Sequence, residues 1–262
     1  MNPALPITDQ SLSARPLLGR TALVTGATGG IGTAICHALA NAGAHVAIAH
    51  FGEDAAAADL LGKLPTRGIA VSGDLTDPKF PAALVDTVTD AFGGVDVLVN
   101  NAGMYPRIRW DKLSEADWEK SFAINFHAPR RLCAAVTASM TERQWGRIVN
   151  IGSINALVGR RDLTPYVAAK AALIGLTRSL AREVGAGGIT VNGVLPGAIQ
   201  VPAEDLLPPT ARVSPEHQIA RQCVPRRGLP EDVAAAVAFL ASPSTEFITG
   251  QNLHVDGGWM MS

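Results

Sequence analysis

The sequence lacks the features that mark secreted, metal-binding and nucleic-acid-binding proteins. Its 3 cysteines are odd in number and far apart, at Cys36, Cys133 and Cys223, which is typical of unpaired thiols in a reducing compartment. None of the 6 histidines has the spacing of a zinc ligand set, so we expect no metal. With 22 basic against 23 acidic residues, the chain has no broad field that would attract nucleic acid or an anionic membrane.

Long apolar runs are also missing. No stretch offers about 18 uninterrupted apolar residues, and the first residues do not show the charged-then-apolar pattern of a secretory signal. We therefore expect a cytoplasmic protein without membrane or nucleic-acid partners. The chain has 262 residues, of which 47% are hydrophobic, so it can bury a full core. We expect a polar tail over residues 1–19 and one domain over residues 20–262.

Short β-branched runs alternate with longer Ala- and Leu-rich helical stretches from Thr21 onward. This alternation predicts an α/β fold, a Rossmann-like doubly wound parallel sheet of about seven strands with helices on both faces. The expected strands cover residues 21–25, 45–49, 69–73, 95–100, 147–152, 189–195 and 252–256. One Pro-rich stretch, residues 201–230, interrupts the rhythm and is expected to be a substrate loop or lid.

A glycine-rich turn follows the first expected strand and leads directly into a helix. It reads T-G-A-T-G-G-I-G over residues 25–32, with the spacing G-x-x-x-G-x-G. Such glycines allow a tight turn, close approach of a pyrophosphate to the backbone and close packing of helix on strand. The anion would lie at the helix N-terminus. The motif predicts a dinucleotide site, although an ordinary strand-to-helix turn also fits the glycines.

A tyrosine and a lysine stand four residues apart in T-P-Y-V-A-A-K, residues 164–170. Thr before Pro is a helix-start signal, with Thr164 as the cap and Pro165 as the first helical residue. Tyr166 and Lys170 then lie on one helix face. A neighbouring ammonium and a helix N-terminus both lower the pKa of a phenol. Taken alone, the spacing also fits a half-buried tyrosine and a solvated lysine.

Together these motifs resemble those of the short-chain dehydrogenase/reductase family. The glycine turn and Y-V-A-A-K are joined by N-N-A-G at 100–103, I-N-F around position 125, N-I-G-S ending at position 153, P-G at 196–197 and the final I-T-G-Q-N-L-H-V-D-G-G. Their order and spacing agree over the whole chain after the tail. The resemblance implies an NAD(P)(H)-dependent oxidoreductase that reduces a ketone to a secondary alcohol, or the reverse, with tyrosine as general acid/base.

The resemblance implies a role for each of four catalytic positions. Tyr166 would give its proton to the carbonyl oxygen, and Ser153 would donate a hydrogen bond to the same oxygen. Lys170 would lower the pKa of Tyr166 and bind the nicotinamide ribose. Asn125 would anchor a water that links Lys170 to solvent, whereas the residues alone indicate only a polar side chain that kinks a helix.

The resemblance also implies the contacts of the coenzyme. Besides Tyr166 and Lys170, they are Gly26, Gly30, Ile31 and Gly32 at the pyrophosphate, Asp74 and Leu75 at the adenine, Asn101, Ala102 and Gly103 at the adenosine ribose, and Pro196, Gly197 and Ile199 at the nicotinamide. An Asp at the end of the second strand would bind the 2′-hydroxyl of NAD, and a basic residue would bind the 2′-phosphate of NADP. The strand ends at His50 with no carboxylate at that position. We therefore expect NADP(H), with NAD(H) possible, bound through Thr28, His50 and Phe51.

Within the family, the closest likeness is to 3-oxoacyl carrier-protein reductases, through S-L-A-R-E-V at 179–184 and L-H-V-D-G-G at 253–258. Those enzymes use two arginines to hold the carrier protein; Arg131 matches one, but Gly187 stands at the other position. A 3-oxoacyl carrier-protein or CoA reductase is therefore the alternative function. Outside this class, a non-catalytic dinucleotide-binding regulator, or an isomerase or dehydratase on the same fold, stays open.

Several arginines lie near the expected pocket mouth, at positions 107, 109, 160 and 161, beside Trp110. They indicate either an acidic substrate or solvated loop charges. The family's usual assembly implies a homotetramer that acts on a small-molecule carbonyl or alcohol.

Overall fold

The structure is a computed structural model that describes residues 15–202, 204 and 214–261. Its strands are β1 (Thr21–Thr25), β2 (His45–His50), β3 (Gly68–Ser72), β4 (Val97–Asn100), β5 (Gly146–Ile151), β6 (Ile189–Pro196) and β7 (Asn252–Val255). Its α-helices are α2 (Gly30–Asn41), α3 (Asp54–Lys63), α4 (Phe80–Phe92), α5 (Glu115–Phe122), α6 (Ala128–Glu142), α7 (Asn155–Val158), α8 (Thr164–Val184), α9 (Pro215–Ile219) and α10 (Pro230–Ala241).

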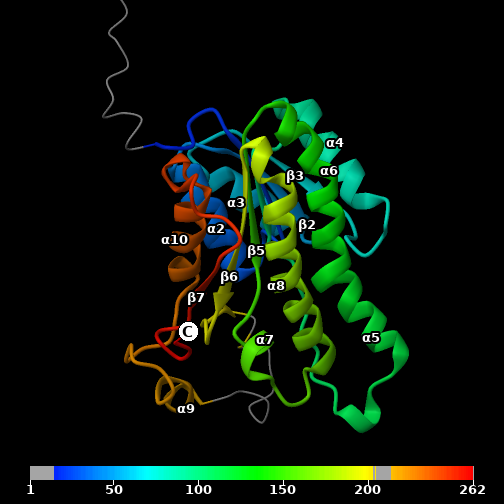
Figure 1. The fold of residues 1–262 in the computed structure, drawn as a ribbon, viewed down its shortest axis with the longest axis vertical. Coiled ribbons are helices and arrows are strands. Elements are labelled where there is room, and N and C mark those ends of the chain that lie inside the picture. The colour runs from blue at the N-terminus through cyan, green and yellow to red at the C-terminus, as the bar shows by residue number, and fades with distance from the viewer. Residues whose placement is uncertain (1–14, 203, 205–213, 262) are drawn as a thin grey trace, which may run out of the picture.

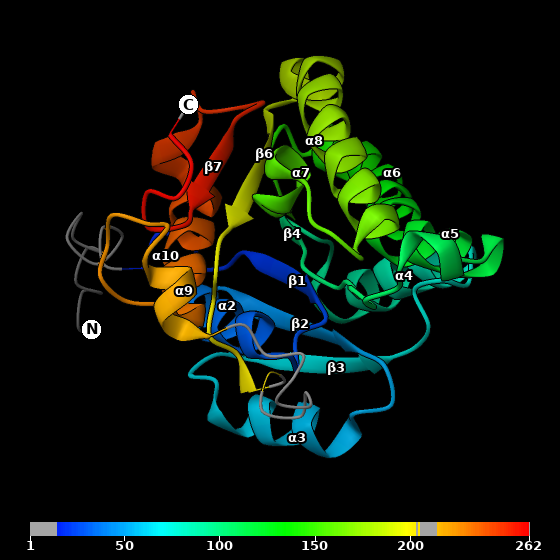
Figure 2. The ribbon, with the colours of Figure 1, turned by 90° about the horizontal axis from the view of Figure 1, so that it is seen from below.

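Within the described residues, seven strands form one parallel sheet in the order β3-β2-β1-β4-β5-β6-β7 (Figure 1). The direction of chain progression reverses at β1, which pairs with both β2 and β4. Helices cover both faces: α2, α3 and α10 lie on one, and α4, α6 and α8 on the other (Figure 2). The predicted fold class is confirmed.

Two apolar clusters, one on each face, hold these layers together. Alternate residues of a strand point to opposite faces, so Ala22 and Val24 of β1 pack with α2 and α10, whereas Leu23 packs with α4 and α6. All three side chains are fully buried. Burial on both faces explains why the central strands are nearly uninterrupted apolar runs.

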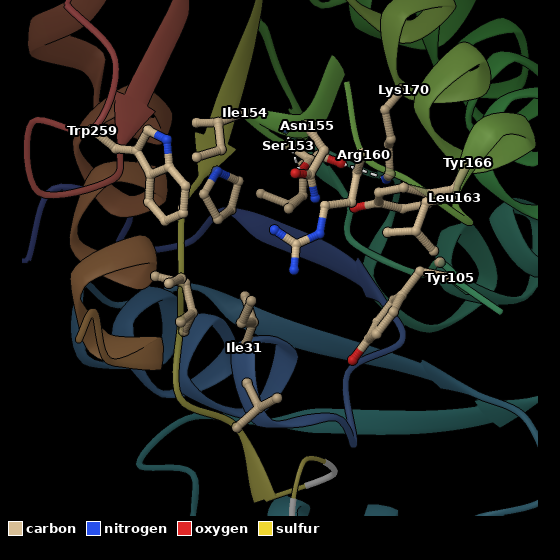
Figure 3. Close-up of a pocket in the computed structure, with 18 of the residues that line it drawn as sticks. Ile31, Tyr105, Ser153, Ile154, Asn155, Arg160, Leu163, Tyr166, Lys170 and Trp259 are labelled. Atoms are coloured by element: carbon tan, nitrogen blue, oxygen red, sulfur yellow. Dashed lines mark hydrogen bonds between the residues drawn. The ribbon is translucent and has the colours of Figure 1, made fainter. Parts of the chain in front are cut away.

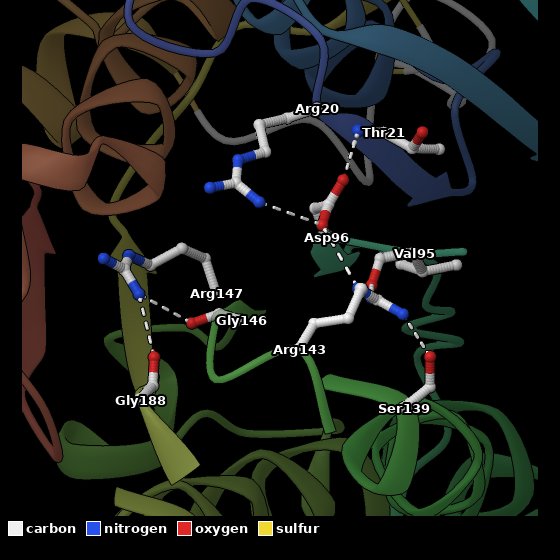
Figure 4. A network of polar contacts seen from close by, with 9 residues as sticks. All are labelled: Arg20, Thr21, Val95, Asp96, Ser139, Arg143, Gly146, Arg147 and Gly188. Carbon is white, nitrogen blue, oxygen red and sulfur yellow. Dashed lines mark hydrogen bonds and ion pairs between the residues drawn. The ribbon is translucent and has the colours of Figure 1, made fainter. Parts of the chain in front are cut away.

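Several charged side chains form a network where the strands begin (Figure 4). Asp96 accepts from the Thr21 backbone N–H at 2.9 Å and lies 3.4 Å from Arg20 and 3.7 Å from Arg143. Arg147 is only 2% exposed, and its Nη1 donates to the carbonyl oxygens of Gly146 at 2.8 Å and Gly188 at 3.3 Å. These contacts tie the beginnings of β1, β4, β5 and β6 together.

The expected strands lie within two residues of the observed ones, but the expected start of α8 is wrong. Thr164 is the first helical residue and not the cap; Leu163 is the N-cap and supplies no side-chain hydrogen bond. Asp162 has a positive φ of 64°, so the chain turns sharply there and enters the helix one residue early. Pro165 still removes no helical hydrogen bond, because the N–H groups of the first turn have no intrahelical partner.

Two expectations fall partly outside the described residues. The N-terminal tail is described only from Arg15, and the expected lid over 201–230 is described except at residues 203 and 205–213. In the part of the chain that is described, no helix is long and apolar enough to cross a membrane.

Candidate active site

A cavity of about 270 Å³ opens where β4, β5 and β6 end (Figure 3). Of the predicted site residues, those that line it are Ile31, Asn101, Gly103, Ser153, Tyr166, Lys170, Pro196, Gly197 and Ile199. Parallel α/β sheets bind ligands beyond the carboxyl ends of their strands, near the point where the strand order reverses. Residues far apart in the sequence therefore meet at the place where the fold favours a ligand.

The glycine turn between β1 and α2 leaves no room for a side chain at Gly26 or Gly32. Gly26 has a φ of +58°, and a Cβ there would lie 2.9 Å from the Cα of Ala102. A Cβ on Gly32 would lie 2.2 Å from the Gly26 carbonyl oxygen. Gly29 caps α2 without a side-chain hydrogen bond, so the first-turn N–H groups can receive an anion. This bare, positively polarised turn fits the pyrophosphate of a dinucleotide.

Asn101 and Thr25 join the end of β4 to the glycine turn. The Asn101 side chain donates to the carbonyl oxygens of Thr25 at 2.9 Å and Gly26 at 3.0 Å. The Thr25 hydroxyl accepts from the backbone N–H groups of Asn101 and Ala102, both at 3.0 Å. The N-N-A-G segment thus fixes the shape of the turn as well as forming part of the cavity wall.

Ser153, Tyr166 and Lys170 meet on the other wall of the cavity. Ser153 follows β5 and is 6% exposed; its hydroxyl accepts from the Asn155 backbone N–H at 3.2 Å. Lys170 is 3% exposed, and its Nζ donates to the Ile151 carbonyl oxygen at 2.7 Å and lies 5.9 Å from the centre of the Tyr166 ring. The tyrosine and the lysine share one face of α8, as their spacing predicts, and the lysine is buried and not solvated.

Burial controls the titration of this pair. It raises the pKa of the Tyr166 phenol, an effect that the Ser153 hydroxyl opposes and Tyr105 reinforces. Burial also lowers the pKa of Lys170 to about 8. The prediction that Lys170 lowers the pKa of Tyr166 is therefore wrong for this state of the protein, because the ammonium is directed at the Ile151 carbonyl and the phenol is removed from water.

Asn125 lies in a single π-helical turn, Ala123–His127, between α5 and α6. It is fully buried. Its amide nitrogen donates to the carbonyl oxygens of Met104 at 2.9 Å and Ser121 at 3.0 Å, and its oxygen accepts from the Met104 N–H at 3.3 Å. The π turn interrupts the regular α-helical hydrogen bonding at this point, and the side chain holds the loop after β4.

Comparison with known proteins identifies the family. A family model described as enoyl-(acyl carrier protein) reductase matches residues 26–260. The chain belongs to the short-chain dehydrogenase/reductase family. It is 41% identical to a 3-oxoacyl-(acyl-carrier-protein) reductase of Vibrio cholerae over 245 residues, 94% of this chain and 99% of the relative. The Escherichia coli enzyme of the same name is 39% identical over 93% of this chain and 98% of its own length.

Solved structures agree with this membership. A blue fluorescent protein from a metagenomic library, crystallised in complex with NADPH, superposes with a TM-score of 0.86 at 38% identity, over 94% of this chain and all of the other. A putative gluconate dehydrogenase from Agrobacterium tumefaciens also reaches 0.86, at 31% identity over 94% and 98% of the two chains. This short-chain dehydrogenase/reductase is therefore an NAD(P)-dependent oxidoreductase, and its substrate is a small-molecule ketone or alcohol.

The expected adenine contacts lie outside the cavity of this dehydrogenase/reductase. Asp74 is exposed, and its Oδ1 accepts from the backbone N–H and hydroxyl of Thr76 at 2.8 and 2.7 Å. Leu75 is buried against the apolar cluster on the α4 and α6 face. Phe51 is 70% exposed at the end of β2. These residues follow the carboxyl ends of β2 and β3. Their contact with adenine stays a prediction.

His50 is almost fully buried at the end of β2, and both of its ring nitrogens have neighbours in the turn that follows. It is 6% exposed; its Nδ1 accepts from the Glu53 backbone N–H at 3.3 Å, and its Nε2 lies 3.7 Å from Asp54. Both nitrogens therefore have partners in the turn that follows β2, and the contact of the imidazole with a coenzyme phosphate stays a prediction. Nearby, the Thr28 hydroxyl donates to the exposed carboxylate of Glu53. The sequence reasoning stopped at position 50 and missed Glu53, although it lies only three residues further on.

Several cavity residues of this family member were missed or left undecided. Tyr105, which packs edge-to-face on Tyr166 with ring centres 6.0 Å apart, and Trp259, near the C-terminus, both line the cavity. No short motif marks Trp259, because its place depends on the path of the chain after β7. Arg160, which the sequence left between substrate contact and solvated charge, also lines the cavity. Among the residues with described positions, no cluster of histidine, cysteine or acidic side chains could hold a metal ion.

Proposed function

We propose that this enzyme reduces a small ketone with NADP(H) and that Tyr166 is its general acid. One observation carries the proposal: Ser153, Tyr166 and Lys170 line the same cavity as Ile31 in the first turn of α2. A proton donor, a hydrogen-bond donor for the carbonyl oxygen and an anion-binding helix end therefore face one space. That combination fits hydride transfer between a dinucleotide and a carbonyl compound.

The chain offers contacts along the length of the coenzyme. The glycine turn with Gly26, Gly30, Ile31 and Gly32 would hold the pyrophosphate, and Asn101, Ala102 and Gly103 the adenosine ribose. Pro196, Gly197 and Ile199 would hold the nicotinamide amide; Gly197 donates to the Val255 carbonyl oxygen at 3.0 Å, so this segment is fixed by β7. When bound, the nicotinamide supplies the hydride for reduction or accepts it in oxidation.

Tyr166 would move the proton. Its raised pKa keeps the phenol protonated at neutral pH, which suits a general acid that protonates the carbonyl oxygen during reduction. Ser153 would donate to the same oxygen, where the hydrogen bond strengthens as negative charge develops. Lys170 would hold the nicotinamide ribose. Asn125 would keep the floor of the site in place and anchor a water near Lys170.

The preference for NADP(H) has two supports and one opposing feature. No carboxylate stands at position 50, and a relative at 38% identity was crystallised with NADPH. The carboxylate of Glu53 lies beside the Thr28 hydroxyl, where it would favour a ribose hydroxyl over a phosphate. We propose NADP(H) as the preferred coenzyme, with NAD(H) accepted.

A 3-oxoacyl carrier-protein or CoA reductase is the second candidate. The relatives at 41% and 39% identity carry that name. Arg131 matches one carrier-binding arginine, and its Nη1 has no hydrogen-bond partner within the described residues. Gly187 at the position of the other arginine makes a carrier protein the weaker candidate.

We further propose a homotetramer in the cytoplasm. Large apolar side chains remain exposed near α8 and β7: Leu157 is 48% and Leu253 40% exposed, which favours contacts with other copies. The three cysteines are all unpaired in the structure, as expected in a reducing compartment.

The chain contains 2 tyrosines, and both line the cavity, so each is a control for the other. Tyr166→Phe should lower kcat for ketone reduction by about 10²- to 10⁴-fold, because it removes a proton donor and almost no volume. Tyr105→Phe should stay within about threefold of wild type. Coenzyme oxidation would be followed with a ketone panel, and coenzyme binding by fluorescence titration should be unchanged in both variants. Residual activity of Tyr166→Phe within tenfold of wild type would remove Tyr166 from this role.

A further inference from the structure

Three arginines from separate segments gather at the mouth of the cavity. Arg107 lies in the loop after β4, Arg160 between α7 and α8, and Arg221 just after α9. Arg107 and Arg160 line the cavity. The Arg221 guanidinium lies 5.4 Å from the ring centre of Trp259, another lining residue. Figure 3 shows the Arg160 guanidinium extending into the open space of the cavity.

Nearby arginines already have acidic partners, whereas this group does not. Arg109 pairs with Asp111 at 2.9 Å, and Arg161, with 90% of its side chain exposed, lies 3.9 Å from Asp162. Within residues 15–202, 204 and 214–261, no carboxylate comes within ion-pair distance of Arg160.

The acidic residue that lines the cavity is also engaged elsewhere. Glu204 accepts from both terminal nitrogens of Arg227, at 2.6 and 2.7 Å. Its carboxylate is therefore paired with Arg227 and not with Arg160.

The positive charge of Arg160 is destabilised by its surroundings. Burial, and then the positive charges of Arg107 and Arg221, lower the pKa of its guanidinium. An arginine still remains cationic at neutral pH. An anion in the cavity would remove the repulsion and supply the missing partner, and a guanidinium binds a carboxylate through two parallel hydrogen bonds.

We propose that the substrate is a small oxo acid whose carboxylate is bound by Arg160, with Arg107 beside it, while its carbonyl faces Ser153 and Tyr166. This rests on the proposed function and names its substrate class. In reduction the carbonyl carbon gains a hydride from the reduced coenzyme and the oxygen gains the Tyr166 proton. The product is a hydroxy acid with its carboxylate unchanged, and the coenzyme leaves oxidised.

The test compares acids with their uncharged methyl esters at three distances between carbonyl and carboxylate: pyruvate, acetoacetate and levulinate. At least one acid should exceed its ester in kcat/KM by tenfold or more with the wild-type enzyme. Arg160→Gln should raise KM for that acid by about 10- to 100-fold, as expected for hydrogen bonds between charged groups, and leave its ester within threefold. Arg161→Gln is the matched control and should change neither, because that side chain is solvated.

Other outcomes overturn the proposal. Equal rates for acids and esters in wild type would exclude an anionic substrate while leaving ketone reduction intact. If Arg160→Gln raised the coenzyme KM and slowed acids and esters alike, Arg160 would belong to the coenzyme site. Should Arg160→Gln fail to fold, Arg160→Lys keeps the charge without the planar fork and should retain part of the acid preference; an unchanged preference contradicts bidentate binding. No turnover of any compound with either coenzyme would remove the proposed function and this proposal together.

Discussion

Replacing Asn125 by Ala should loosen the loop that follows β4. The side chain makes four hydrogen bonds from a fully buried position, two to the backbone of Met104 and two to the carbonyl oxygen and the hydroxyl of Ser121. Alanine would leave all of these groups without this partner. The neighbouring residues Gly103 and Tyr105 line the cavity, so the loss should reach the substrate as well as the fold.

The size of the effect follows from the burial of the groups left behind. A buried polar group that loses its partner costs about 1 to 3 kcal/mol. Met104 is only half-buried, so water can replace part of what is lost there, and we expect a net cost of about 2 to 3 kcal/mol. For a chain of this length, 1 kcal/mol corresponds to about 2 to 4 °C in Tm, so Tm should fall by roughly 4 to 12 °C.

The measurement combines thermal unfolding with hydrogen exchange over residues 102–106 and steady-state kinetics. Exchange in that segment should accelerate and KM for the ketone should rise. Ser121→Ala is the control: it removes only the longest of the four bonds, from the Asn125 amide to the Ser121 hydroxyl at 3.4 Å. Because the other three bonds remain, Tm should change little. A Tm of Asn125→Ala within 2 °C of wild type would refute the reasoning. A fall in kcat without a fall in Tm would instead favour a role in the proton relay alone.

Other expectations concern pH, coenzyme choice and assembly. The pKa of Tyr166 is raised, and reduction needs the protonated phenol, so kcat/KM for ketone reduction should stay flat through neutral pH and fall only in the alkaline range. The rate of alcohol oxidation should rise with pH, because it needs the deprotonated phenol. A decline in the reduction rate near pH 7 would contradict this. Glu53→Gln should increase the ratio of kcat/KM with NADP(H) to kcat/KM with NAD(H), because it removes a negative charge beside Thr28. Asp54→Asn, which changes the neighbouring carboxylate near His50, should leave that ratio unchanged. Equal effects of the two substitutions in coupled assays would rule out a specific role for Glu53. Light scattering at micromolar concentration should give a tetramer, and a monomer would exclude the proposed assembly.

Sequence patterns predicted the sheet well because most of its strands are buried on both faces. β1, β4, β5 and β6 are buried at every position, so their apolar runs stand out from the helical stretches around them. β3 is partly exposed, with a mixed burial pattern, and its expected bounds were shifted by one residue. The fully buried β4 and β5 also differ from their expected bounds, by two residues at the start of β4 and by one residue along β5, so burial reveals the strands and not their exact ends.

The sequence predicted which residues form the candidate site better than it predicted their pKa shifts and contacts. Short motifs indicated that Ser153, Tyr166 and Lys170 would come together, and the cavity contains all three. The direction of the Tyr166 pKa shift could not be read from the motif, because burial by distant segments and the path of the Lys170 side chain to the Ile151 carbonyl decide it. For the same reason the burial of His50 and the contact of Glu53 with Thr28 required the packed structure.

The charged network at the strand beginnings has a consequence for how such an enzyme can change over generations. Arg20, Asp96, Arg143 and Arg147 tie the sheet together at one edge, and the residues around the cavity belong to the other. A substitution in a loop beyond the carboxyl ends of the strands leaves every one of those ties in place. Residues that contact the substrate can therefore change at the carboxyl ends of the strands while the network at the opposite ends preserves the scaffold.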